Sequence, residues 1–160
     1  MNFFTDTIKN LTEYQKLSES LKLKKNSIYL HGIVKENLYH LVYSIYKNEG
    51  KNILIVTEDE MAAKKLVDDL EVVDSSIVEH FPEIELNFYN FSSLEKKNED
   101  QRLKVLNRLM EGSPFITVAS SRAIQRKLTK KNRYKDMTLE IAVENTLDLD
   151  ELSEKLIELN

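Results

Sequence analysis

The stretch that decides the fold of this chain is Ile53-Leu54-Ile55-Val56-Thr57-Glu58-Asp59-Glu60. Its first four residues form a continuous apolar run, which is typical of a parallel strand covered on both faces. The next four residues have the pattern of a helix capping box. Apolar residues then recur at the i, i+3, i+4, i+7 spacing of a buried helix face, at Ala63, Leu66, Val67 and Leu70. The stretch therefore predicts a strand that runs directly into a helix.

Working outward, the same alternation of strands and helices recurs along the chain. Residues 28–42 have the pattern of a strand, a turn and a helix, and Gly50 stands where that helix would end. We expect further strands at 77–81, 86–91 and 115–119, a helix at 98–110, and an opening helix from Thr5 to Leu23 on the sheet edge. This order predicts an α/β fold, a three-layer sandwich with a mainly parallel, doubly wound sheet.

The turn between residues 28 and 42 stands where a nucleotide-binding domain would keep its phosphate loop, but most of that motif is missing. Such a loop needs several glycines, a Lys for the phosphates and a hydroxyl for Mg²⁺. Only Gly32 and Lys35 fit this pattern. Tyr29 and Val34 replace two glycines, and Glu36 replaces the hydroxyl with a carboxylate that would repel phosphates.

Two interpretations of Gly32 and Lys35 follow. They could be a residual phosphate site, or a tight turn followed by a solvated lysine. We favour the second interpretation, because the β-branched Val34 resists the positive φ angles that a phosphate cradle often uses. We therefore expect no cofactor.

Composition excludes several other functions. The chain has 160 residues, a net charge of −4 and no cysteine, so disulfides and thiol chemistry are excluded. No apolar run is long enough to span a bilayer and no signal peptide is indicated, so we expect a cytoplasmic protein with no membrane partner. The three histidines are scattered, which argues against a metal site, and Ser120-Ser121 lacks the flanking glycines of a nucleophile elbow, so no catalytic residue is expected.

The character of the sequence changes after Ser120, and we expect residues 1–120 to form the nucleotide-binding-like domain and 121–160 a connector and an incomplete second α+β subdomain. A helix is expected from about Arg122, capped by the serines, then an exposed strand from Met137 to Val143 and a last helix after Asp148 whose apolar stripe suggests truncation. The connector is strongly basic, with Arg122, Arg126, Lys127, Lys130, Lys131 and Arg133. This run could contact nucleic-acid phosphates, although a solvated connector is the commoner explanation.

The most distinctive stretch runs from Phe81-Pro82-Glu83 to Phe88-Tyr89-Asn90-Phe91-Ser92-Ser93 and is followed by Gln101-Arg102-Leu103. Its aromatic residues fit core packing better than a stacking platform. The order of these blocks resembles the N-terminal module of bacterial transcription-repair coupling factors (Mfd), from about Ser27 to the C-terminus. That module is similar to the first domain of the repair protein UvrB, so the resemblance also implies a degenerate P-loop NTPase fold.

The resemblance implies a function that the residues alone do not. It implies a domain without catalysis inside a large protein, whose separate C-terminal motor uses ATP to move along DNA and displaces stalled RNA polymerase. It also implies recruitment of UvrA through the second subdomain, and contacts with the C-terminal region that hold the protein in a resting state. The rival hypotheses are a helicase fragment that still binds nucleotide through Lys35, and a free-standing interaction module.

Overall fold

The computed structural model describes residues 3–23, 27–84, 93–138 and 149–158. These residues form two compact units, residues 1–125 and residues 126–160, and each unit is considered by itself. The first unit contains the helices α1 (Phe3–Lys9), α2 (Thr12–Lys22), α3 (Leu38–Glu49), α4 (Glu60–Asp74) and α5 (Ser93–Glu111), the 3₁₀ turn η1 (Lys35–Asn37), and the strands β1 (Ile53–Thr57), β2 (Val78–Phe81) and β3 (Ile116–Ser120).

The sheet of the first unit is parallel and has the order β1-β3-β2. Ile53 of β1 and Val78 of β2 both lie opposite Ile116 of β3, so the last strand in sequence is the middle strand in space. Each strand is reached through a helix, as parallel strands require. All five residues of β3 are buried, including the polar Thr117 and Ser120, as expected for the middle strand of a parallel sheet.

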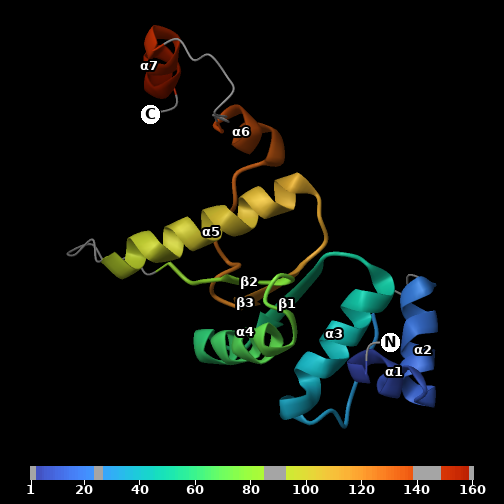
Figure 1. Ribbon diagram of the computed structural model, residues 1–160. Helices are drawn as coiled ribbons and strands as arrows, with labels where there is room; N and C mark the ends of the chain where they lie inside the picture. The colour runs from blue at the N-terminus through green and yellow to red at the C-terminus, as the bar shows by residue number, and fades with distance from the viewer. Residues whose placement is uncertain (1–2, 24–26, 85–92, 139–148, 159–160) are drawn as a thin grey trace. The chain divides into compact units, whose positions relative to one another are not determined.

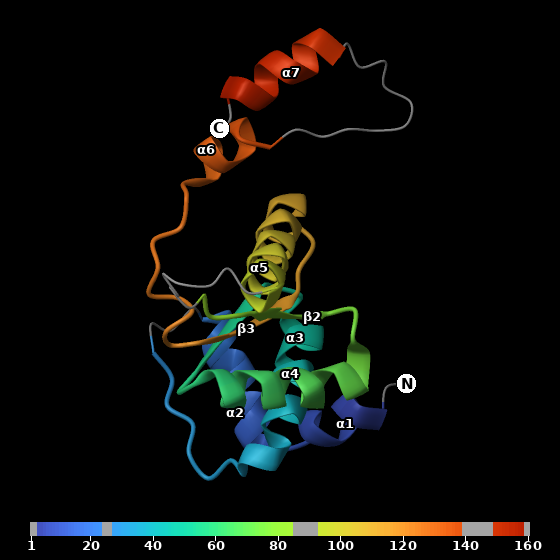
Figure 2. The same ribbon diagram turned by 90° about the vertical axis from the view of Figure 1, so that its left-hand side faces the viewer.

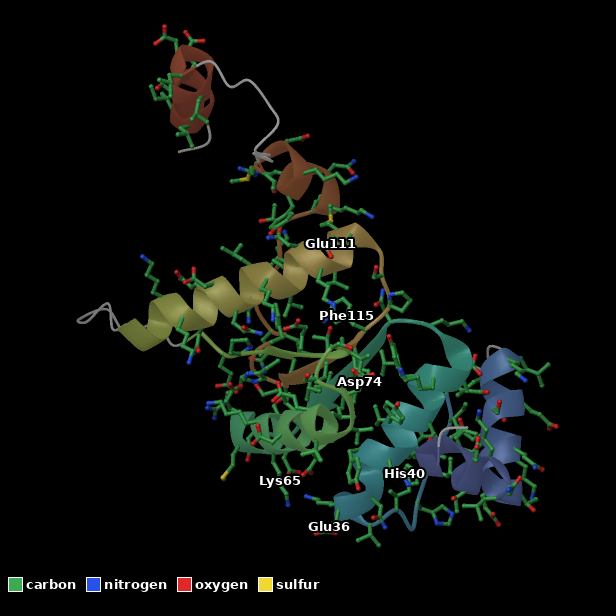
Figure 3. The ribbon with its side chains drawn as sticks, in the orientation of Figure 1. Glu36, His40, Lys65, Asp74, Glu111 and Phe115 are labelled. Carbon is green, nitrogen blue, oxygen red and sulfur yellow. The ribbon has the colours of Figure 1, made fainter. Side chains whose placement is uncertain are left out.

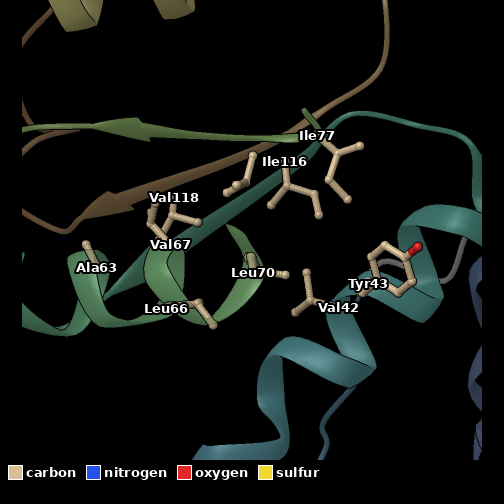
Figure 4. Packing of buried hydrophobic residues seen from close by; sticks show 10 residues of the cluster. Val42, Tyr43, Ala63, Leu66, Val67, Leu70, Ile77, Ile116 and Val118 are labelled. Atoms are coloured by element: carbon tan, nitrogen blue, oxygen red, sulfur yellow. The ribbon is translucent and has the colours of Figure 1, made fainter. Parts of the chain in front are cut away.

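One face of the sheet packs on α3 and α4. The helix residues Ala63, Leu66, Val67 and Leu70 pack with Val42 and Tyr43 of α3 against Ile77, Val78, Ile116 and Val118, as Figure 4 shows at close range. Leu70 and Ala63 are fully buried. The stripe predicted for α4 therefore forms the main core.

The opposite face of the sheet is covered by α5, which lies across it in both ribbon views (Figures 1 and 2). Val105 packs with Phe81, Phe115, Ala119 and Ala123 in a second, smaller core. Helices thus lie on both faces of the parallel sheet, and the predicted α/β sandwich is confirmed. The prediction that the strand at 53–56 is covered on both faces is wrong, because Leu54 and Val56 on one face of β1 are 59% and 46% exposed.

Polar side chains on one flank of α5 bind the edge strand β2. The buried Glu79 accepts hydrogen bonds from Gln101 (3.1 Å), Lys104 (2.9 Å) and Arg108 (2.9 Å). Arg102 is also buried, and its guanidinium donates to the carbonyls of Pro82 and Ala123 at 2.8 and 3.1 Å. Gln101 and Arg102 of the predicted motif thus fix α5 on the sheet, whereas Leu103 is exposed.

Three local predictions for this unit are wrong. Residues 28–31 form no strand, since they lack a paired neighbour in the described sheet. The single opening helix is two helices, broken at Asn10 and Leu11, and α1 packs on α3 rather than on the sheet edge. Residues 121–124 form a turn instead of a helix, in which the Ser120 hydroxyl accepts a hydrogen bond from the Ala123 amide at 3.1 Å.

The described residues of the second unit form two helices, α6 (Lys131–Asp136) and α7 (Leu149–Glu158). Leu149, Leu156 and Ile157 of α7 are exposed, at 75%, 56% and 76%. The strand predicted at 86–91, residues 139–143 of the strand predicted at 137–143, and the cap at Asp148 lie outside the described residues. Met137 and Thr138 directly follow α6 and are not part of a strand. The two compact units divide after Gln125. The domain boundary expected at residue 120 stays a prediction. No helix in the described ranges combines the length and the apolar character needed to cross a bilayer.

Candidate functional site

The place where a phosphate loop would act is a cavity at the carboxyl end of β1. The cavity has a volume of about 450 Å³ and lies between η1, the end of β1 and the first turns of α4. Ligands of parallel α/β sheets bind outside the carboxyl ends of the strands, so this is the correct place for a nucleotide. Its lining includes Lys35, Glu58, Asp59, Lys65 and Asp69. Figure 3 labels Lys65 on α4 and Glu36 in η1, just before α3.

The segment that leads into the degenerate loop does not hold it against the sheet. Tyr29 and Leu30 are 92% and 50% exposed, where a buried strand would be needed to position the loop. Gly32 has a φ of +79°, a conformation that favours glycine. Gly32 therefore makes a tight turn, but it lacks the neighbouring glycines that would complete a phosphate cradle.

Lys35 faces an acidic side chain in this cavity. Its ammonium Nζ lies 3.2 Å from Glu58 Oε1, in an ion pair between two largely exposed side chains. An exposed pair of this kind contributes little to stability, so it does not itself prevent binding. It does place a carboxylate at the position that a β- or γ-phosphate would occupy beside the lysine.

The N-terminus of α4 is closed by its own cap. The Asp59 carboxylate Oδ1 accepts a hydrogen bond from the Ala62 amide at 2.8 Å. The hydroxyl of Thr57 donates to the Asp59 carbonyl at 2.8 Å and holds the turn. An N-cap carboxylate takes up the helix amide donors and the positive end of the helix dipole, which a phosphate would otherwise use.

The charge of the cavity disfavours an anion. Three carboxylates line it, those of Glu58, Asp59 and Asp69, against the two ammonium groups of Lys35 and Lys65. Glu36 adds a further carboxylate one residue from Lys35. A triphosphate brought to this cavity would meet more negative than positive charge.

A second polar cluster lies at the carboxyl ends of β2 and β3. His80 Nε2 is buried 3.1 Å from Glu60 Oε1 but without the geometry of a hydrogen bond, so it has no hydrogen-bond partner. Burial, and then the nearby Lys64, lower the pKa of His80, and burial raises the pKa of Glu60. The hydroxyl of Ser120 donates to Glu83 at 2.5 Å. No pattern in the sequence indicated this cluster, because its residues come from three separate segments, the start of α4, β2 with the residues after it, and the end of β3.

The basic residues predicted as a contact surface are divided between the units. Arg122 is exposed in the turn after β3, in the first unit. The other five are exposed in the second unit, at Arg126, Lys127, Lys130, Lys131 and Arg133. In the part of the chain that the structure describes, no group of three His, Cys, Asp or Glu residues could hold a metal ion.

Comparison with curated proteins gives a consistent result. The chain is 29% identical to the transcription-repair-coupling factor of Bacillus subtilis, over an alignment that covers 94% of this chain. It is 22% identical to the factor of Staphylococcus haemolyticus over 97% of this chain, and 25% identical to that of Staphylococcus epidermidis over 71%. The predicted resemblance to transcription-repair-coupling factors is confirmed.

The transcription-repair-coupling factors in this comparison are much longer than the present chain. It spans 13% of the Bacillus subtilis protein and 10% of the Staphylococcus epidermidis protein. No protein-family model and no solved structure matches the chain. The comparison therefore relates this α/β unit to one part of each factor.

Proposed function

We propose that this chain is a non-catalytic scaffold of a transcription-repair-coupling factor and acts in the cytoplasm. The observation that supports the proposal is the cavity at the end of β1, where Glu58 pairs with Lys35 and Asp59 caps α4. A working nucleotide site would need these donors for phosphates. The core around α4 and β3 is intact, so the chain keeps the parallel sheet and crossover helices of a nucleotide-binding domain, but not the strand that would position its phosphate loop.

The wider role follows from the family that the chain resembles. The complete factor would displace stalled RNA polymerase by moving along DNA with a separate ATP-driven motor. The present part would support the recruitment of UvrA and help to hold the factor in a resting state. In this proposal the chain itself needs no cofactor.

Calorimetric titration of the 160-residue chain with Mg-ATP and with Mg-ADP tests the absence of a nucleotide site. We expect no binding heat from the chain, from Lys35→Ala or from Glu58→Gln, which would free the lysine. Circular dichroism would check that all three proteins are folded. Micromolar binding that Lys35→Ala abolishes would contradict the proposal and favour a helicase fragment with a residual phosphate site.

The recruitment of UvrA needs a separate experiment on a protein with the length of the relatives. We expect that removing residues 121–160 abolishes UvrA capture without lowering ATP hydrolysis by the motor. Unchanged UvrA capture would contradict this part of the proposal. If the chain is instead a free-standing interaction module, the protein that contains residues 121–160 should capture no UvrA.

A further inference from the structure

The segment 126–135 is strongly basic within an acidic chain. The whole chain has a net charge of −4, yet these ten residues contain no Asp or Glu. Their cationic side chains are those of Arg126, Lys127, Lys130, Lys131, Arg133 and Lys135. This concentration of charge of one sign creates a local positive potential, which marks a surface for an anionic partner.

The six cations are exposed and available. Each of them is exposed, and none forms an ion pair with another residue that the structure describes. Two cations of the first unit are used differently: Lys104 and Arg108 both bind the buried Glu79. The charges of segment 126–135 therefore have no comparable structural role within the described residues.

The segment is better suited to contact the phosphate backbone of a nucleic acid than its unpaired bases. Lys130 has an extended conformation and leads into the short helix α6, so the cations follow one another along the chain. Tyr134 is the only aromatic residue of the segment, and it is half-buried, with its pKa raised by burial. Single-strand binding depends on aromatic platforms that stack unpaired bases. A duplex, whose bases are already stacked, needs only cations along its phosphates.

We propose that segment 126–135 binds the phosphate backbone of double-stranded DNA without reading its sequence. Cations that neutralise phosphates release condensed counterions, and this release supplies the affinity. The choice of DNA over RNA rests on the proposed function, since a repair-coupling factor works on DNA. The contact would let the scaffold stay close to the duplex while other parts of the factor act on it.

Fluorescence anisotropy of a labelled duplex of arbitrary sequence, titrated with the 160-residue chain at several salt concentrations, tests the proposal. With six phosphate contacts, the logarithm of the binding constant should fall with the logarithm of salt at a slope of about −5. In the variant Lys127→Ala/Lys130→Ala/Lys131→Ala, the magnitude of that slope should fall by about 3, and the duplex should bind more weakly at low salt.

The matched control is Lys16→Ala/Lys96→Ala/Lys97→Ala. It removes the same charge from exposed positions of α2 and α5, and it should bind the duplex nearly as well as the unmodified chain. Equal weakening by both triple variants would contradict a localised site, because net charge alone would then explain binding. Thermal unfolding would verify that both variants are folded.

Competitors identify the partner. Tighter binding of single-stranded DNA, or of a polyglutamate peptide, would overturn the proposal, as would the absence of duplex binding at low salt. Equal affinity for duplex RNA would overturn the choice of DNA. Nucleotide binding in the Mg-ATP titration would contradict the proposed scaffold function and leave the salt slope of segment 126–135 unchanged, so the two failures can be told apart.

Discussion

Two connections in the first unit have similar sequence patterns and different structures. Residues 53–60 run from a strand into a capped helix, as their sequence predicts. Residues 28–38 have a comparable apolar start, a turn and a helix, but they form an exposed segment and a 3₁₀ turn before α3. The first connection contains a strand and a capped helix. Of the elements predicted for the second connection, only the helix forms.

The difference lies in the neighbours of each connection rather than in its own residues. β1 pairs along its whole length with β3, from Ile53 opposite Ile116 to Thr57 opposite Ser120. Residues 28–31 have no such neighbour among the described residues. A strand needs a paired neighbour for its backbone hydrogen bonds, so local β propensity alone does not make one.

The largest expected difference between the connections is in core packing. Leu70→Ala, on the helix that follows β1, should lower the free energy of unfolding by about 2–5 kcal/mol, because Leu70 is fully buried. The matched variant Leu30→Ala, in the segment before α3, should cost less than about 1 kcal/mol, since Leu30 is 50% exposed. Urea denaturation of both variants measures the two values, and equal losses would show that the segment before α3 is packed as a strand.

The next difference is in the helix caps. Asp59→Ala removes the acceptor of the Ala62 amide and should cost about 1 kcal/mol. Asn37 holds the corresponding position before α3 but makes no side-chain cap hydrogen bond, so Asn37→Ala should cost less than about 0.5 kcal/mol. The denaturation midpoints of the two alanine variants compare their stabilities directly. A larger loss of stability for Asn37→Ala than for Asp59→Ala would contradict the conclusion that α4 has the stronger cap.

The smallest expected effect is a pH dependence at the beginning of α4. The fold lowers the pKa of His80 below its ordinary value of about 6.5, so His80 stabilises the fold above that pH and this stability is lost as the pH falls through the lowered pKa. Lys64 adds to this lowering and Asp68 opposes it. Glu60 has a raised pKa, so its carboxyl group contributes in the opposite direction as the pH falls.

The measurement is the urea midpoint from pH 7 downward, for the unmodified chain and for His80→Gln. The variant cannot take up the proton, so it should lose less stability below about pH 6.5 than the unmodified chain does. Parallel curves for the two proteins would mean that His80 is not the group responsible.

The sequence predicted the secondary structure correctly where a local pattern also has a packed or paired neighbour in the fold. The buried stripe of α4, the apolar strands β1 and β3, and the left-handed Gly50 that ends α3 were all predicted from short stretches. The prediction of a strand at the start of residues 28–42 was wrong because this pattern has no neighbour to pair with in the part of the chain that the structure describes. The break between α1 and α2 was missed because their apolar spacing continues across it.

The candidate site could be predicted only in part, because most of its contacts join distant residues. The degenerate loop was visible in the sequence, since Tyr29, Val34 and Glu36 replace residues that the motif needs. The pairing of Lys35 with Glu58 was not visible, because it depends on how α3 packs beside β1. The approach of His80 to Glu60 likewise depends on the order of the strands.

The position of β3 has a consequence for how the chain is synthesised. β1 and β2 each pair with β3 and not with each other, and β3 is made after both of them. Within the described sheet, the two earlier strands therefore have no pairing partner until residues 116–120 have left the ribosome. A pause in translation before Ile116 would lengthen the exposure of their apolar side chains, so chaperones that bind nascent chains would be most needed in that interval.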